Sequence, residues 1–175
     1  GTAIRPGDIL SMRNGKTIEV INTDAEGRLI MADALAFASE SKPDIICDVA
    51  TLTGAAYVAL GVEIGAVFSN NKVTLDSFLN SNNDGFENYH SLPLEQSYKS
   101  QIKSSIADMK NSGGRFGGAI TAALLLEEFV DDLDWIHLDI AGPARSRSSN
   151  SIYPEGGTGF GVLGYFNFLA NEANG

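Results

Sequence analysis

The part of the sequence best suited to chemistry is residues 22–29, which hold Asp24, Glu26 and Arg28 at alternate positions. A strand pattern gives way to a helix pattern here, and alternate side chains of an extended chain lie on one face. We therefore expect two carboxylates and a guanidinium to face one cleft at the carboxyl end of a strand, where open α/β sheets bind ligands. Without a nearby imidazole or thiolate, the carboxylates favour Mg²⁺, Mn²⁺ or Zn²⁺, and one Glu could bridge two ions. Taken alone, an Asp-x-Glu-x-Arg pattern more often marks a charged surface cluster at a capped helix start.

Two glycine-rich segments could present backbone N–H groups to an anion. Residues 159–164 match G-x-G-x-x-G, but residues 153–156 before them have no strand pattern. A dinucleotide-binding motif needs that strand, and an acidic residue about twenty positions later. We expect a loop that leads into a helix. Residues 113–118 also precede a helix and could bind an anion, although a mobile loop is the simpler interpretation.

Other reactive side chains are interpreted as structural. His137 and Asp139 alternate on a central strand and could form a ligand pair, but we expect buried, hydrogen-bonded structural roles for them. Cys47 lies in a buried strand with no adjacent histidine, which favours a small core residue over a nucleophile. The acidic residues between 127 and 134 are interpreted as a solvated helix end rather than a metal site. Arg145 and Arg147, in a serine-rich loop, are expected to be exposed.

The elements that position these groups begin with a β-hairpin. Residues 9–12 and 17–21 flank Asn14 and Gly15, a dipeptide that accepts the positive φ angles of a tight turn. Residues 22–24 then offer side chains that cap a helix. Pro43 is expected to end that helix, because its ring fixes φ and removes the N–H donor.

The rest of the chain alternates between strand and helix patterns. The run at 45–50 is almost continuously apolar, as in a parallel strand that is covered on both faces. The remaining expected elements are helices at 29–39, 55–60, 119–130 and 162–170 and from Leu75 onward, strands at 64–68 and 135–140, and a polar loop at 80–88. This alternation predicts an α/β fold in three layers, with a mostly parallel central sheet flanked by helices and preceded by the hairpin. We find no internal repeat, linker or second domain in residues 1–175.

Composition excludes several classes of function. The 175 residues carry 12 Lys and Arg against 22 Asp and Glu, a formal net charge of −10, which is poorly suited to binding nucleic acid or an anionic membrane. The single cysteine cannot form an intrachain disulfide, so a disulfide-stabilised secreted scaffold is excluded. Glycines and threonines interrupt the most apolar stretch, residues 49–68, which therefore fits buried strand and helix segments better than a membrane span.

The segment around Asp24 closely resembles the signature of the leucine (cytosol) aminopeptidase family. The resemblance rests on NGKTIEV at 14–20 and NTDAEGRL at 22–29. It continues along the chain through ATLTGA at 50–55, LPL at 92–94, KS and AD within 103–108, GGAI at 117–120 and HLDIAGP at 137–143. It therefore covers essentially the whole chain.

The resemblance implies a dinuclear metallo-exopeptidase with Mn, Zn or Mg ions. In such enzymes the residue matching Asp24 binds one metal ion, the residue matching Glu26 bridges both, and the residue matching Arg28 holds a bicarbonate ion that acts as general base. The physics agrees, because two cations acidify a bridging water and polarise the scissile carbonyl, and arginine binds a planar carbonate with two parallel hydrogen bonds.

The resemblance also implies positions that bind the peptide substrate. These are Thr51, Leu52, Gly54 and Ala141, which contribute backbone groups and the side-chain pocket. Arg145 departs from the family pattern, since many members carry an aromatic residue there, and this bears on substrate preference near that loop.

A larger departure lies at the start of the chain. The family's other metal ligands, one Lys and two Asp, and its catalytic Lys lie upstream of the signature, and the 23 residues before Asp24 do not show that pattern. We therefore expect residues 1–175 to be the C-terminal portion of a single catalytic domain, without peptidase activity on its own.

The expected function of the parent protein is metal-dependent release of N-terminal amino acids, with a leucine-type preference, by two-metal hydrolysis. The alternatives are a non-catalytic binding or assembly module that keeps the fold, and a nucleotide-binding α/β domain. Retention of Asp24, Glu26 and Arg28 together favours the enzyme. The resemblance further implies a homohexamer in the cytoplasm.

Overall fold

The expected hairpin is confirmed by the computed structural model, which describes residues 3–83, 85–149 and 152–173. Strand β1 (Ile9–Ser11) pairs antiparallel with β2 (Thr17–Glu19). The turn between them differs in detail from the expectation, because Gly15 takes a φ of 86° whereas Asn14 keeps a negative φ. The Gly15 N–H donates to the Met12 carbonyl at 2.9 Å, which closes a turn longer than the expected two-residue one. Such a turn needs one residue in the left-handed region, and Gly15 supplies it.

The chain divides into two compact units. Unit 1 consists of Gly1–Ile46 and Pro93–Trp135, and unit 2 consists of Cys47–Leu92 and Ile136–Gly175. Each unit is therefore assembled from two stretches of sequence, and long-range contacts within a unit decide where its functional residues lie.

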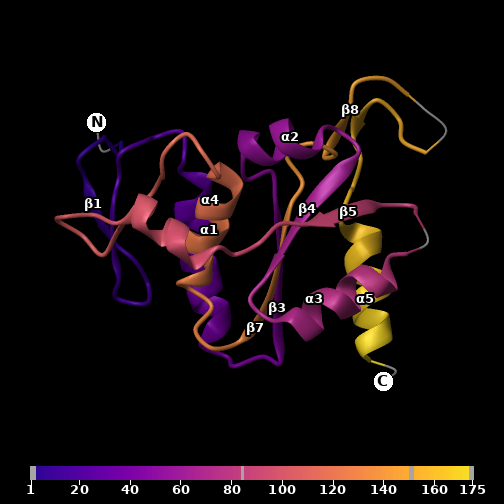
Figure 1. The fold of residues 1–175 in the computed structure, drawn as a ribbon, viewed down its shortest axis with the longest axis horizontal. Coiled ribbons are helices and arrows are strands. Elements are labelled where there is room, and N and C mark those ends of the chain that lie inside the picture. The colour runs from indigo at the N-terminus through magenta and orange to yellow at the C-terminus, as the bar shows by residue number, and fades with distance from the viewer. Residues whose placement is uncertain (1–2, 84, 150–151, 174–175) are drawn as a thin grey trace. The chain divides into compact units, whose positions relative to one another are not determined.

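Unit 1 joins the hairpin sheet to two helices. Strand β6 (Met109–Lys110) adds to the sheet in parallel with β2. Helices α1 (Gly27–Ser39) and α4 (Gly118–Glu127) lie side by side (Figure 1), and the 3₁₀ helix η1 (Gln96–Ile102) contacts α4. The core of the unit is apolar: α4 is buried along almost its whole length, as its continuous apolar sequence requires.

One cluster of charges in unit 1 differs from the expectation of a solvated helix end. Glu128, just after α4, accepts hydrogen bonds from the Nζ atoms of Lys16 and Lys99, each at 2.5 Å. Burial opposes ionisation of Glu128, but the hydrogen bonds from the two lysines outweigh it and lower its pKa. The Glu128 carboxylate therefore links the hairpin to η1, which the sequence pattern alone did not reveal.

Unit 2 is built around a four-stranded sheet in the order β3-β7-β4-β5. Its strands are β3 (Ile45–Ala50), β4 (Ile64–Ser69), β5 (Asn88–Ser91) and β7 (Asp134–Asp139). Strand β4 runs parallel to β5 and antiparallel to β7. The expected α/β class is confirmed, whereas the antiparallel pairing of β4 with β7 was not anticipated by the strand and helix alternation.

Three helices accompany this sheet, and two very short strands form a separate ribbon. The helices are α2 (Gly54–Leu60), α3 (Lys72–Ser81) and α5 (Val162–Glu172), and the ribbon pairs β8 (Arg145–Ser146) with β9 (Gly156–Gly157). Helices α2 and α3 contact β4, and α3 lies beside α5 (Figure 1). Aromatic rings fill the space between them, with Phe78 of α3 centred 5.7 Å from the Phe168 ring of α5.

Two local expectations differ from the structure. The expected polar loop at 80–88, of which residue 84 lies outside the described residues, is present but shorter: α3 continues to Ser81 and β5 begins at Asn88, where pairing with β4 outweighs the polar composition of the strand. Residues 22–24 do not cap α1: Glu26 occupies the cap position and makes no side-chain cap hydrogen bond. The Asn22 side chain instead accepts a hydrogen bond from the Asp24 N–H within the preceding turn.

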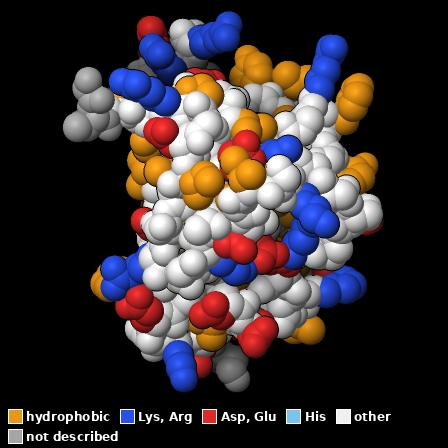
Figure 2. Space-filling view, turned by 90° about the vertical axis from the view of Figure 1, so that its left-hand side faces the viewer, with side chains coloured by type: hydrophobic (Ala, Val, Ile, Leu, Met, Phe, Trp, Pro, Cys, Tyr) orange, Lys and Arg blue, Asp and Glu red, His pale blue; other side chains and the backbone are white. Residues whose placement is uncertain are grey.

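Charged side chains of both signs lie on the surface. On the face shown in Figure 2, basic side chains lie among acidic ones in its lower half, with isolated apolar side chains between them.

Among the described residues, no helix is long and apolar enough to cross a membrane.

Candidate functional site

The carboxylates expected to bind metal lie on a turn of unit 1 that leads from β2 into α1. The expectation of an extended chain is wrong here, because the Ala25 N–H donates to the Asn22 carbonyl at 3.3 Å and Glu26 already has helical angles, φ −75° and ψ −33°. The turn leaves Asp24 and Glu26 exposed, whereas Arg28, one residue into the helix, is buried.

Asn111 fixes this turn from a distant part of the sequence. It is fully buried, and its Oδ1 accepts hydrogen bonds from the backbone N–H groups of Ile21 and Asn22 at 2.9 and 3.2 Å. Its Nδ2 donates to the Asn22 carbonyl at 2.6 Å, and its backbone carbonyl accepts from Arg28 Nη1 at 3.0 Å. One residue thus orders both the turn that carries the two carboxylates and the guanidinium that follows it.

Replacing Asn111 with alanine is expected to lower the free energy of unfolding of the protein by about 3 kcal/mol, because the fully buried side chain would lose its three hydrogen bonds to the backbone of Ile21 and Asn22. The matched control is Asn80→Ala, at an exposed position on α3, which is expected to change stability by less than about 0.5 kcal/mol. Urea denaturation measures both. Equal stability of the two variants would contradict the role given to Asn111.

Asp24 and Glu26 fit a divalent cation as oxygen ligands. Neither carboxylate accepts a hydrogen bond from the described part of the chain, so their oxygen atoms are available. Carboxylate oxygens suit Mg²⁺, Mn²⁺ and Zn²⁺. The described residues contain no group of three or more His, Cys, Asp or Glu arranged to hold a metal ion. Asp24 and Glu26 therefore fit as two ligands of a site that needs further ligands.

The positions expected to bind substrate lie in unit 2, on two segments that follow strands. Thr51, Leu52 and Gly54 follow β3, and Ala141 follows β7. The structure brings these two segments together through one side chain, the Asp139 carboxylate. Thr51 and Gly54 are exposed, and Leu52 and Ala141 are half-buried, so a ligand has access to this surface.

The Asp139 carboxylate accepts four hydrogen bonds, and only 1% of the residue's surface is exposed. Its Oδ1 accepts from the backbone N–H groups of Leu52, Thr53 and Ala141 at 3.0, 3.3 and 3.2 Å, and its Oδ2 accepts the Thr53 hydroxyl at 2.6 Å. The same hydroxyl oxygen accepts the Ala56 N–H and so caps α2. The expectation of a buried, hydrogen-bonded structural role for Asp139 is confirmed.

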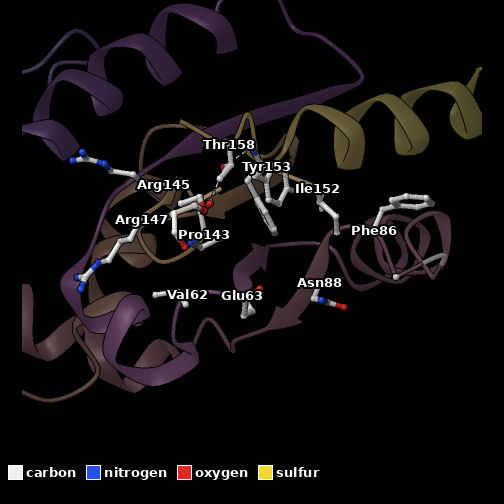
Figure 3. Close-up of a pocket in the computed structure, with 14 residues that line it drawn as sticks. Val62, Glu63, Phe86, Asn88, Pro143, Arg145, Arg147, Ile152, Tyr153 and Thr158 are labelled. Carbon is white, nitrogen blue, oxygen red and sulfur yellow. Dashed lines mark hydrogen bonds between the residues drawn. The ribbon is translucent and has the colours of Figure 1, made fainter. Parts of the chain in front are cut away.

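A pocket of about 320 Å³ lies in unit 2 and is drawn in Figure 3. One of its lining residues, Pro143, follows Ala141 by two positions in the sequence. Pro143, Tyr153 and Thr158 line one part of it, and the Thr158 hydroxyl donates to the Pro143 carbonyl at 2.7 Å. In Figure 3 the guanidinium groups of Arg145 and Arg147 lie on the side opposite Phe86. Both arginines are exposed, as expected, although Arg145 belongs to the β8–β9 ribbon rather than to a loop.

Tyr153 lines this pocket, and the pKa of its hydroxyl is raised above the ordinary value. Burial raises the pKa of its hydroxyl, and the negative charges of Glu87 and Glu63 add to the shift. The phenol is protonated at neutral pH, as an ordinary tyrosine would also be.

The G-x-G-x-x-G match at 159–164 forms a loop that leads into α5, as expected. The Gly161 and Gly164 N–H groups donate to the Glu87 carboxylate at 2.9 and 2.7 Å. Glu87 is 5% exposed, and it occupies the helix N-terminus where a bound pyrophosphate would need those donors. The nucleotide-binding alternative therefore has no support at this segment.

His137 is buried and hydrogen-bonded, as expected, whereas Cys47 is half-buried rather than a core residue. His137 is fully buried on β7, and its Nδ1 lies 2.5 Å from Asp48 Oδ1, so its partner is Asp48 rather than Asp139. Burial raises the pKa of the Cys47 thiol to about 11, with a smaller contribution from the Asp48 charge. Cys47 is half-buried and scarcely ionised at neutral pH, which makes it a poor nucleophile.

Sequence reasoning missed Asn111, and it did not predict which backbone groups the Asp139 carboxylate would bind. Asn111 lies 83 positions from Arg28, and Asp139 lies 87 positions from Leu52. Asp139 lies in the HLDIAGP segment that carries the resemblance, whereas no signal marked Asn111, because local periodicity does not report contacts between distant segments.

The chain is similar to a known protein family and to several of its members. A model described as the cytosol aminopeptidase family, catalytic domain, matches residues 1–164. A probable cytosol aminopeptidase of Synechococcus sp. (strain CC9902) is 51% identical over 174 residues, which are 99% of this chain and 36% of that protein. The chain spans about a third of the length of the curated relatives it matches.

Solved structures agree with this comparison. A tomato leucine aminopeptidase mutant has a TM-score of 0.90 and 44% identity, and the match covers 96% of this chain and 32% of that one. The cytosol aminopeptidase of Coxiella burnetii has a TM-score of 0.91 and 41% identity, covering 98% of this chain and 38% of that one. The fold is therefore shared well above the level of chance similarity.

Proposed function

The chain belongs to the cytosol aminopeptidase family, and we propose that residues 1–175 are the C-terminal portion of the catalytic domain of a metal-dependent aminopeptidase. The complete protein, meaning the whole polypeptide that contains this chain, would release N-terminal residues from peptides with a leucine-type preference. One observation carries the proposal. In a chain of this family, the exposed and unpartnered carboxylates of Asp24 and Glu26 directly precede the buried guanidinium of Arg28.

We assign Asp24 and Glu26 as ligands of two divalent ions, manganese or zinc, with magnesium as a further candidate, and Glu26 as the ligand that bridges them. When bound, such ions supply polarisation of the scissile carbonyl and a lowered pKa for the attacking water. Arg28 would hold a bicarbonate through its guanidinium, as the catalytic residue of this chain. Its hydrogen bond to the Asn111 carbonyl supports this role by fixing the orientation of the side chain.

Thr51, Leu52, Gly54 and Ala141 are assigned to substrate binding. This role is supported by their exposed or half-buried positions on the two segments that follow β3 and β7. The bound peptide would meet these backbone groups without displacing any core residue. We further propose a homohexamer located in the cytoplasm, on the strength of the family alone.

Leucine release by the complete protein tests the proposal. We expect hydrolysis of leucine p-nitroanilide that a chelator abolishes and that added Mn²⁺, Zn²⁺ or Mg²⁺ restores, because the bound ions would polarise the scissile carbonyl and lower the pKa of the attacking water. N-acetylated substrate is the control and should remain intact, since an aminopeptidase requires the free amine. Failure to release leucine with Mn²⁺, Zn²⁺ and Mg²⁺ alike would contradict the proposed function.

A further inference from the structure

The N–H groups of Leu52, Thr53 and Ala141 all point at one buried acceptor, the Asp139 carboxylate. Three backbone donors and one hydroxyl converge on two oxygen atoms that solvent does not reach. Hydrogen bonds to a carboxylate are about twice as strong as those between neutral groups. This arrangement therefore constrains both backbone segments at once.

The bonds also decide which way the remaining backbone groups face. In a planar trans peptide the N–H and the preceding C=O point in opposite directions. Because the N–H groups of Leu52 and Thr53 point toward Asp139, the carbonyl oxygens of Thr51 and Leu52 point away from it. Neither of these carbonyls has a partner in the described part of the chain. They are acceptors whose direction depends on the buried carboxylate.

We propose that Asp139 is a positioning residue that sets the orientation of the substrate-binding segments on which Leu52 and Ala141 lie. This rests on the proposed function, because it takes those segments to contact the peptide. Asp139 itself is too buried to touch the substrate, and it acts only through the backbone groups that it holds.

Glu87 provides a matched control within unit 2. It is also a buried carboxylate, 5% exposed, and it also accepts two backbone N–H bonds, from Gly161 and Gly164. Its bonds order the start of α5 and involve none of the proposed substrate-binding residues. Loss of Glu87 should therefore cost stability without changing substrate binding.

The test compares Asp139→Asn with Glu87→Gln in the complete protein. We expect Asp139→Asn to raise KM for leucine p-nitroanilide about tenfold while kcat changes less than about threefold, since the segments bind ground state and transition state alike. Glu87→Gln should lower the unfolding midpoint but leave KM unchanged. Thr53→Ser keeps a hydroxyl that can donate to Asp139 Oδ2, so its KM should equal that of the wild type. Thr53→Val removes that hydroxyl and should raise KM. Unchanged KM in Asp139→Asn, or equal changes in both carboxylate variants, would overturn the proposal.

Amide hydrogen exchange on the same samples separates this proposal from the proposed function. Asp139→Asn should speed exchange at Leu52, Thr53 and Ala141 and leave Gly161 and Gly164 unchanged, and Glu87→Gln should do the reverse. Wild-type protein that releases no leucine would contradict the proposed function and the substrate role of Asp139 with it. Exchange would still show whether Asp139 orders the segments, and unchanged exchange at all three amides would overturn that part.

Discussion

Replacing Glu26 with Gln in the complete protein is expected to lower kcat/KM for leucine p-nitroanilide about 10³-fold, equivalent to about 4 kcal/mol of transition-state stabilisation. The amide keeps the size of the side chain but removes the negative charge that a bridging ligand of two cations must supply. Glu26 is exposed and makes no side-chain cap bond to α1, so the fold should not depend on its charge. Steady-state kinetics and the metal content of the purified protein measure the effect.

Asp44→Asn is the control for this variant. Asp44 is an exposed carboxylate in the same unit, outside the turn that carries Glu26. Its replacement changes the net charge by the same amount as Glu26→Gln and leaves the proposed metal ligands in place. Its kinetics and metal content should match the wild type. A Glu26→Gln variant that keeps its metal and its activity would remove Glu26 from the metal site.

Gly142→Ala is expected to destabilise the complete protein by at least about 3 kcal/mol. A Cβ placed on Gly142 would lie well inside van der Waals distance of the Gly61 carbonyl oxygen, and that atom belongs to the backbone. Because no side-chain rotamer can relieve the clash, either the Gly61 turn or the segment after β7 must move. The segment after β7 carries Ala141, so activity should fall together with stability.

Gly157→Ala separates this clash from the general effect of removing a glycine. A Cβ at Gly157 meets no atom within 4 Å, and its φ is not in the left-handed region. Its effect on the free energy of unfolding should stay within about 1 kcal/mol. Similar urea midpoints for the two variants would show that the close approach of Gly142 to Gly61 does not constrain the fold.

The elements that could be predicted from the sequence are those whose signals are local. The apolar run at 45–50 became β3 with the expected bounds, and the helix at 29–39 ends at Ser39, four residues before Pro43. Helix α1 begins two residues earlier than expected. The expected start was the first apolar residue of the pattern, Leu29, but Gly27 and Arg28 already belong to the first helical turn. Periodicity and proline were sufficient where the interactions lie within one element.

The elements that could not be predicted depend on partners far away in the sequence. Strand β5 is polar and forms because β4 offers an edge, and β6 and β8 are two-residue strands without any periodicity. The same limit applied to the site. Asp24, Glu26 and Arg28 were selected from residue type and resemblance, but the expected extended backbone was wrong, since Asn22 and Asn111 fold that segment into a turn.

The central claim is that Asp24 and Glu26 bind metal, and anomalous X-ray diffraction from crystals of the complete protein grown with Mn²⁺ or Zn²⁺ tests it most directly. Our account predicts two anomalous peaks, one within bonding distance of the Asp24 carboxylate and both within bonding distance of Glu26, about 2.0–2.2 Å for zinc. Arg28 should keep its hydrogen bond to the Asn111 carbonyl in that structure. Metal ions bound away from both carboxylates would contradict the account.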